Sequence, residues 1–278
     1  MRSAITLAAR PDFSVTAVSC RDDHTRWSAP EVHDDYRVVL VRRGRFRRRA
    51  SGTAADIDAT TAYVGVPGEE EHFAHPAGGD DCTSVSVTPA LWRTLAGDAT
   101  RPPAPSLYAD APLDLAHRRL LASARSGDVD YALTEELLGL LAATLARAVT
   151  APAPRSGGDA ALVAAAREAI TAAHPAAEGL LPLARLLDAS PYRLSRAFTR
   201  ELGVSLTRYR NRVRVARALD RLEQGEPSLA ALAADLGFAD QSHLTRTLQH
   251  HLGRTPTSLR RLLIPDGSRP PRGRNGAG

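Results

Sequence analysis

This 278-residue chain has few cysteines, no long apolar run and no group of residues at the spacing of a catalytic site. Two cysteines, Cys20 and Cys82, are too few for a disulfide scaffold, so we expect both to be reduced. No apolar run approaches the roughly 18 residues of a membrane span, and residues 1–10 are too short and polar for a signal peptide. No paired carboxylates, nucleophile–base set or iron triad stands at a spacing suited to catalysis. These absences exclude a disulfide-built domain and a membrane protein, and we expect a cytoplasmic protein that is not an enzyme.

Lysine is missing altogether, so all 36 basic residues are arginine, and the net charge is +5. This charge is unevenly distributed. Residues 182–264 hold 14 arginines against 7 acidic residues, a net charge of +7, whereas residues 1–181 hold 19 against 23, a net charge of −4. A basic C-terminal third beside an acidic remainder indicates that only the C-terminal third meets a polyanion.

The stretch 228–261 has the residue pattern of two short helices around a turn. Gly237 suits a turn that needs a positive φ, and Asp240 can accept the first free N–H groups of a following helix. Leucines recur every four residues from 244 to 252, which predicts a buried stripe, and Gly253 ends the helix. The opposite face carries four hydrogen-bonding side chains: Gln241, Ser242, His243 and Arg246. The pattern is typical of a helix-turn-helix, although an ordinary helical hairpin with a solvated polar face would show the same periodicity.

A second copy at 181–205 favours the helix-turn-helix interpretation. Ser190 and Pro191 begin its second helix, and the exposed face of that helix is polar and basic. Arginine can chelate the guanine edge, while tyrosine and serine can reach bases or phosphates. The candidate DNA-binding residues on this helix are Tyr192, Arg193, Ser195 and Arg196.

Between the two copies, residues 205–223 are predicted to form one continuous helix. At about 1.5 Å per residue these 19 residues span roughly 28 Å, near the roughly 34 Å repeat of B-DNA. One chain is therefore expected to seat two recognition helices in successive major grooves. We expect the arginines of this helix to be available for phosphate contact: Arg208, Arg210, Arg212, Arg214, Arg217 and Arg221.

Residues 162–263 resemble the DNA-binding domain of the AraC/XylS family of transcription regulators. The fixed spacings that carry the resemblance lie at Gly237-Phe238, the run 240–243, Arg246, Gly253 and Thr255-Pro256. Leu244 and Leu248 replace phenylalanines that are common in the family, and both stay apolar.

The resemblance implies a transcription regulator whose partner is double-stranded DNA and, for an activator, RNA polymerase. It implies that bases are read by Tyr192, Ser195 and Arg196 in the first unit and by Gln241, Ser242, His243 and Arg246 in the second.

Short β-branched runs separated by glycine and proline turns extend from Phe13 to about Val87 and predict an antiparallel barrel or sandwich. Gly44 is predicted to turn a hairpin within this region. The N-terminal half is similar to the cupin-like effector and dimerisation domain of many such regulators. Farther on, leucines recur every four residues from 133 to 145, and this stripe is expected to pack either on the barrel or on a second copy of the chain.

The predicted fold class is therefore α+β, with a cupin-like β-barrel and flanking helices before an all-α domain whose two helix-turn-helix motifs are joined by a long helix. We expect residues 1–149 to be the effector-sensing and dimerisation domain, 150–159 a linker, 160–264 the DNA-binding domain and 265–278 a disordered tail.

The β-rich half is expected to sense a small organic effector in an apolar lumen, against the aromatic residues Trp27, Tyr36, Phe46 and Tyr63. We expect no cofactor and no resident metal. Candidate metal ligands are nevertheless Cys20, His72, His75 and Cys82. The two histidines, three residues apart, would point to opposite faces of a regular strand, so zinc binding requires a turn or a neighbouring strand to bring a cysteine alongside. Two alternatives stay open: a metal- or redox-responsive regulator using Cys20 and Cys82, and a cupin enzyme fused to a DNA-binding domain.

Overall fold

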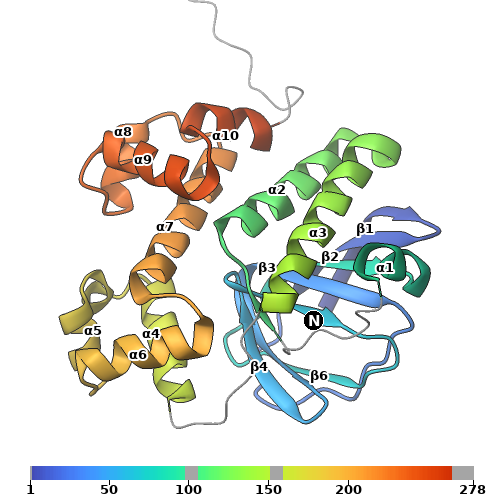
Figure 1. Ribbon diagram of the computed structural model, residues 1–278, viewed down its shortest axis with the longest axis horizontal. Helices are drawn as coiled ribbons and strands as arrows, with labels where there is room; N and C mark the ends of the chain where they lie inside the picture. Colours follow the sequence, from blue (N-terminus) through green and yellow to red (C-terminus); the bar gives the residue numbers. More distant parts are fainter. Residues whose placement is uncertain (1, 98–105, 151–158, 265–278) are drawn as a thin grey trace, which may run out of the picture.

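The computed structural model describes residues 2–97, 106–150 and 159–264, which form a β-rich part followed by a helical part (Figure 1). The predicted linker between them and the predicted tail at 265–278 fall largely or wholly outside the described residues, since the first part ends with helix α3 at Thr150 and the second begins with helix α4 at Ala160. The boundaries of the four predicted segments stay predictions. Among the described residues, no helix is long and apolar enough to cross a membrane.

Within the described residues, eight strands form the β-rich part, and all their pairings are antiparallel. They are β1 (Arg2–Arg10), β2 (Phe13–Cys20), β3 (Tyr36–Ala50), β4 (Thr53–Asp58), β5 (Thr61–Gly65), β6 (Glu71–Ala74), β7 (Asp80–Val87) and β8 (Leu107–Tyr108). The order along the main sheet is β1-β2-β7-β3-β5-β8, and β4 and β6 pair with the far half of β3. The predicted antiparallel β fold is confirmed.

Strand β3 is continuous through Gly44, so the predicted hairpin at that glycine is wrong. Its first half pairs with β5 and β7, and its second half pairs with β4 and β6, so one strand belongs to two layers. Gly44 has a φ of 74°, and a Cβ there would lie 2.2 Å from the carbonyl oxygen of Gly79. The glycine therefore permits a change of strand direction and a close backbone approach, and the chain turns later, at Ser51-Gly52.

Alternate residues of β3 enter two separate cores. Val38 and Leu40 pack under the helices, whereas Val39 and Val41 face the interior between the layers with Phe46 and Tyr63. Because both faces are buried here, residues 38–41 are apolar without alternation. Of the aromatic residues predicted to line the lumen, Tyr36 instead stacks on Trp92 beneath the helices, at 4.4 Å between ring centroids.

Three helices complete this part: α1 (Pro89–Ala96), α2 (Ala111–Ser126) and α3 (Thr134–Thr150), the last preceded by a π-helical turn, η1 (Val129–Leu133). The leucine stripe packs inside the subunit, because Leu133, Leu137 and Leu141 are fully buried in the core that the helices share with the sheet. Of the two partners predicted for this stripe, the sheet of the same chain is the one observed, and a second chain is excluded for these three leucines. Leu138, on the outer side of α3, is 39% exposed.

The burial of the stripe predicts different costs for two adjacent leucines. We expect Leu137→Ala to lower the free energy of unfolding by about 2–5 kcal/mol, because it opens a cavity in a packed core. Leu138→Ala is the matched control and should cost less than about 1 kcal/mol. Urea unfolding followed by circular dichroism measures both values. Equal costs for the two variants would contradict the inward orientation of the stripe.

The helical part consists of α4 (Ala160–Thr171), the 3₁₀ turn η2 (Pro175–Glu178), α5 (Leu180–Leu186), α6 (Pro191–Leu202), α7 (Leu206–Glu223), α8 (Leu229–Asp235), α9 (Gln241–Leu252) and α10 (Pro256–Leu263). It has two small cores, and α7 contributes to both: Tyr209 and Val213 pack with α4–α6, whereas Val215, Leu219 and Leu222 pack with α8–α10. The predicted architecture of two units joined by a long helix is confirmed.

Candidate DNA-binding surface and its junction with the β-rich part

Helix α6 is the second helix of the first unit and presents a polar, basic outer face. Its first turn is fixed by Ser190, whose hydroxyl accepts from the Arg193 N–H at 3.1 Å, and it ends at Gly203 in the left-handed conformation. Leu194 and Phe198 are fully buried on the inner face. The helix therefore has one face fixed in the unit and the other directed to solvent.

The candidate residues of α6 differ in how they are held. Tyr192 is 68% exposed, and its hydroxyl accepts a hydrogen bond from Arg196 at 2.5 Å, with the guanidinium 5.3 Å from the ring centroid. This contact holds the two side chains together on the surface. Arg193, also exposed, pairs with Asp159 at 3.0 Å, and Ser195 is half-buried. Tyr192 and Arg196 are thus an exposed pair, whereas Arg193 is partly engaged with the start of α4.

Helix α9 occupies the same place in the second unit. Gly237 has the predicted positive φ, 68°, and the Asp240 carboxylate caps the helix by accepting from the His243 N–H at 2.6 Å. Leu244 and Leu248 are fully buried. Of the candidate residues, three are exposed: Gln241, Ser242 and Arg246.

His243 is the exception in this group. It is half-buried, with its ring edge-on to Phe238 at 5.4 Å between centroids, and its Nδ1 accepts from the Ala239 N–H at 3.4 Å. These contacts join the helix to the preceding turn, so His243 stabilises the motif in addition to any base contact.

Helix α7 does not offer all its arginines to a phosphate backbone, and that prediction is wrong for Arg212, which is 2% exposed. Arg214 and Arg217 donate to backbone carbonyls of neighbouring segments, and Arg221 forms ion pairs within the unit. Arg208 is exposed. Most of the charge on this helix therefore serves packing.

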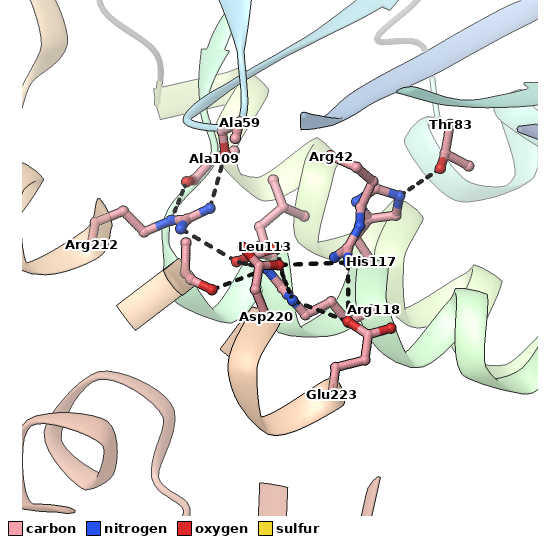
Figure 2. Close-up of polar contacts among 12 residues, drawn as sticks. Arg42, Ala59, Thr83, Ala109, Leu113, His117, Arg118, Arg212, Asp220 and Glu223 are labelled. Carbon is pink, nitrogen blue, oxygen red and sulfur yellow. Dashed lines mark hydrogen bonds and ion pairs between the residues drawn. The ribbon is translucent and has the colours of Figure 1, made fainter. Parts of the chain in front are cut away.

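Arg212 joins α7 to the β-rich part (Figure 2). Its guanidinium donates to the carbonyl oxygens of Ala109 at 2.8 Å and Ala59 at 3.0 Å. A third nitrogen lies 3.3 Å from the Asp114 carboxylate on α2. Arginine suits this position because its planar fork supplies several donors in fixed directions.

Arg118 on α2 makes the reciprocal contact with α7, from the other side of the same junction (Figure 2). It pairs with Asp114 on its own helix at 3.0 Å, and with Asp220 and Glu223 of α7 at 2.8 and 3.1 Å. Arg42 of β3 also reaches Glu223, at 3.0 Å. Apolar contacts extend the junction, since Ala111 and Leu115 of α2 belong to the core of the second unit.

The buried groups of the junction keep a defined charge near neutral pH. Burial by itself would raise the pKa of the Asp114 carboxyl, but the guanidinium groups of Arg118 and Arg212 outweigh it and hold that pKa at about 2. Burial lowers the pKa of His117 to about 3, and Arg42 adds to the effect. The neutral His117 ring lies 2.8 Å from the Thr83 hydroxyl. An ionised Asp114 is thus held between two arginines while the neighbouring histidine stays uncharged.

The candidate metal ligands are only partly brought together. Ligand atoms of Cys20 and His75 lie within 4.8 Å of each other and of Asp80, a residue that sequence reasoning missed. Cys82 lines the same cavity. His72 points elsewhere, with Nδ1 3.0 Å from the Ser28 carbonyl oxygen. Neither cysteine forms a disulfide within the described part of the chain.

Comparison with known proteins agrees with this geometry in the C-terminal region. Residues 183–262 match the family model described as a helix-turn-helix domain. No curated protein matches the chain.

Solved structures are similar only at low identity. ToxT from Vibrio cholerae O395 is 12% identical over 91% of this chain and 99% of its own, with a TM-score of 0.39. The C-terminal domain of AraT, a response regulator from Geobacillus stearothermophilus, is 23% identical over 43% of this chain and 100% of its own, with a TM-score of 0.37. A cupin superfamily protein from Desulfitobacterium hafniense is 11% identical over 32% of this chain and 78% of its own, with a TM-score of 0.28.

Two compact units with exposed second helices, joined through one long helix, define a DNA-binding domain of the helix-turn-helix class. The matched region, residues 183–262, is a helix-turn-helix domain of the AraC type, the domain class of DNA-binding transcription regulators.

Proposed function

We propose that this chain is a sequence-specific transcription regulator in which one protomer reads two successive major grooves of double-stranded DNA. The observation that carries the proposal is the presence of an exposed, polar second helix at each end of α7. This helix has 18 residues and is therefore about 27 Å long. Both units pack on the same rigid rod, so their spacing is set before DNA binds.

DNA contact is assigned to residues on the outer faces of α6 and α9. The assigned residues are Tyr192, Arg193, Ser195, Arg196, Gln241, Ser242, His243 and Arg246. Arg196 and Arg246 have the chemistry for guanine, because a guanidinium can donate to both O6 and N7. Gln241 can pair in the same bidentate manner with adenine. The remaining residues can reach bases or phosphates.

Control by a small effector is assigned to the cavity between the two layers of the β-rich part. This cavity has a volume of about 160 Å³ and is lined by apolar groups, including Val39, Phe46 and Tyr63, and by several polar side chains. An apolar cavity with a few polar groups is the usual form of a small-molecule site.

The junction between α2 and α7 provides a route from effector to DNA. Helix α2 carries Arg118 and Asp114, which hold α7, and it packs on the second unit through Ala111 and Leu115. A ligand that shifts the β-rich part therefore changes the packing of the DNA-binding domain, provided that the two arrangements differ in affinity for that ligand.

A homodimer is proposed because two copies would engage four grooves and gain from effective concentration. The buried leucine stripe of α3 is not its interface. For an activator, RNA polymerase is the further partner.

The proposal predicts strongly salt-dependent DNA binding by the full-length chain. Between about 50 and 200 mM salt we expect the affinity to fall by about 10³-fold or more, because several phosphates exchange counterions for arginine. Fluorescence anisotropy with a duplex selected from a random library measures this. A DNA-binding affinity that does not change with salt concentration would contradict the proposal. The same titration with a single-stranded oligonucleotide is the control for duplex recognition.

A further inference from the structure

Three potential metal ligands from two distant parts of the sequence meet at one end of the main sheet. Cys20 is the last residue of β2, Asp80 is the first residue of β7, and His75 follows directly after β6. Cys20 and Asp80 are direct partners in the β2–β7 register, so their side chains lie on the same face. The donor atoms of all three residues lie within 4.8 Å of one another.

The group is buried and held by its backbone. Cys20 and Asp80 are each 3% exposed, and His75 is half-buried. The His75 N–H donates to the His24 carbonyl oxygen at 3.0 Å. At Gly79, a Cβ would lie 2.3 Å from the Cys20 carbonyl oxygen, so the β6–β7 connection can lie directly on the end of β2 because it has glycine there.

The local charge favours a cation. Among the described residues, the Asp80 carboxylate contacts the His75 ring, with Nδ1 2.9 Å from Oδ1, and accepts a hydrogen bond from the Cys82 thiol. A buried carboxylate whose ion-pair partner is a histidine, and not an arginine, leaves negative charge that a bound cation would balance. In the same cavity, Glu71 is by contrast already paired with Arg37 and Arg48.

We propose that Cys20, His75 and Asp80 form a binding site for Zn²⁺ or a similar transition-metal ion. One sulfur, one imidazole nitrogen and one carboxylate oxygen are a ligand set suited to zinc, whereas calcium and magnesium take oxygen ligands. Binding forms a metal–sulfur bond, and the thiol proton is released to solvent. Three protein ligands leave a fourth position for water.

The geometry requires only small movements. Tetrahedral zinc with bonds of about 2.0–2.3 Å places its ligand atoms about 3.3–3.8 Å apart. The observed upper limit of 4.8 Å is therefore close to the separation that a bound ion needs. Cys82 lines the same cavity but lies outside the group of three. The three ligands line the cavity to which a small effector is assigned above, but the proposed site does not depend on DNA binding.

Co²⁺ titration of the full-length chain, purified free of metal, tests the site. We expect one Co²⁺ per chain, with tetrahedral d–d bands and a sulfur-to-cobalt charge-transfer band, and displacement of Co²⁺ by Zn²⁺. Cys20→Ser should abolish the charge-transfer band. Cys20→Ser, His75→Ala and Asp80→Asn should each weaken the binding of Zn²⁺ by more than about 100-fold, because each removes a direct ligand.

Two variants within a few residues serve as matched controls. Cys82→Ser keeps a hydroxyl that can donate to Asp80 as the thiol does, and His72→Ala changes a histidine outside the group. Both variants should leave the charge-transfer band and the Zn²⁺ affinity within about threefold of the parent chain. Unchanged Zn²⁺ affinity in Cys20→Ser, or an equal loss in Cys82→Ser, would overturn the assignment. Circular dichroism of each metal-free variant identifies any that does not fold. If Cys20→Ser or His75→Ala does not fold, the Zn²⁺ affinity of Asp80→Asn is compared instead with that of its control, Asp81→Asn.

Discussion

Arg118→Ala will lower the free energy of unfolding of the full-length chain by about 3–5 kcal/mol. Arg118 is 3% exposed and contacts three carboxylates, those of Asp114, Asp220 and Glu223. Removing one partner of a buried ion pair costs this much because the opposite charge is left buried without full compensation. Asp114 retains Arg212 at 3.3 Å, but the contact between α2 and α7 loses its central cation. Urea unfolding followed by circular dichroism measures the cost.

The adjacent residue provides the control. Arg119 lies on the outer side of α2, is 37% exposed by side chain and pairs with Glu136 at 2.6 Å. Because surface ion pairs contribute about 0–1 kcal/mol, Arg119→Ala should lie within that range. A loss below about 1 kcal/mol in Arg118→Ala would show that the junction does not stabilise the chain. Its assigned role in joining the two parts would then be wrong.

Arg196→Ala and Arg246→Ala will each relax sequence preference at one of two separate positions in the DNA site. Both side chains are exposed, one on α6 and the other on α9, and each is assigned a bidentate base contact. Loss of such a contact costs about 1–3 kcal/mol of discrimination, a factor of about 5 to 150 at that base pair. The two affected positions should lie about one helical turn apart, because each helix occupies its own major groove. Selection from a random duplex library with each variant measures the preference at every position.

Arg93→Ala is the matched control for lost positive charge. Arg93 is exposed on α1 in the β-rich part, so its removal should leave sequence preference unchanged. Should Arg196→Ala and Arg246→Ala weaken binding to all sequences equally, the two arginines are phosphate anchors and the bases are read by other residues.

The helix-turn-helix units were predictable from the sequence because their signals are local. A helix start requires an acceptor such as Ser190 or Asp240, and a turn with positive φ favours glycine, as at Gly237. The buried leucines recur with the period of the helix itself. Each signal lies within a few residues of the structure it predicts, so no knowledge of distant partners is needed.

The β-rich half shows where local signals are ambiguous. Gly44 adopts the positive φ that its sequence context suggested, yet the strand continues, because the glycine serves a close approach to Gly79. The leucine stripe of α3 predicted that these residues are buried but did not indicate what they pack against. In the structure they pack against the sheet of the same chain and not against a second chain.

The sequence by itself determined where the second helix of each unit begins, the buried leucine stripe of the second unit and the excess of arginine in the C-terminal third. Only the tertiary structure decided what each charge does. Arg208 and Arg212 lie one helical turn apart and are chemically identical, but Arg212 faces Ala109 and Asp114, about 100 residues away, and is buried. Likewise, Cys20 gains His75 and Asp80 as neighbours only when strand ends meet. The reason is physical: periodicity and caps act within one element, whereas burial of a charge depends on which distant groups surround it.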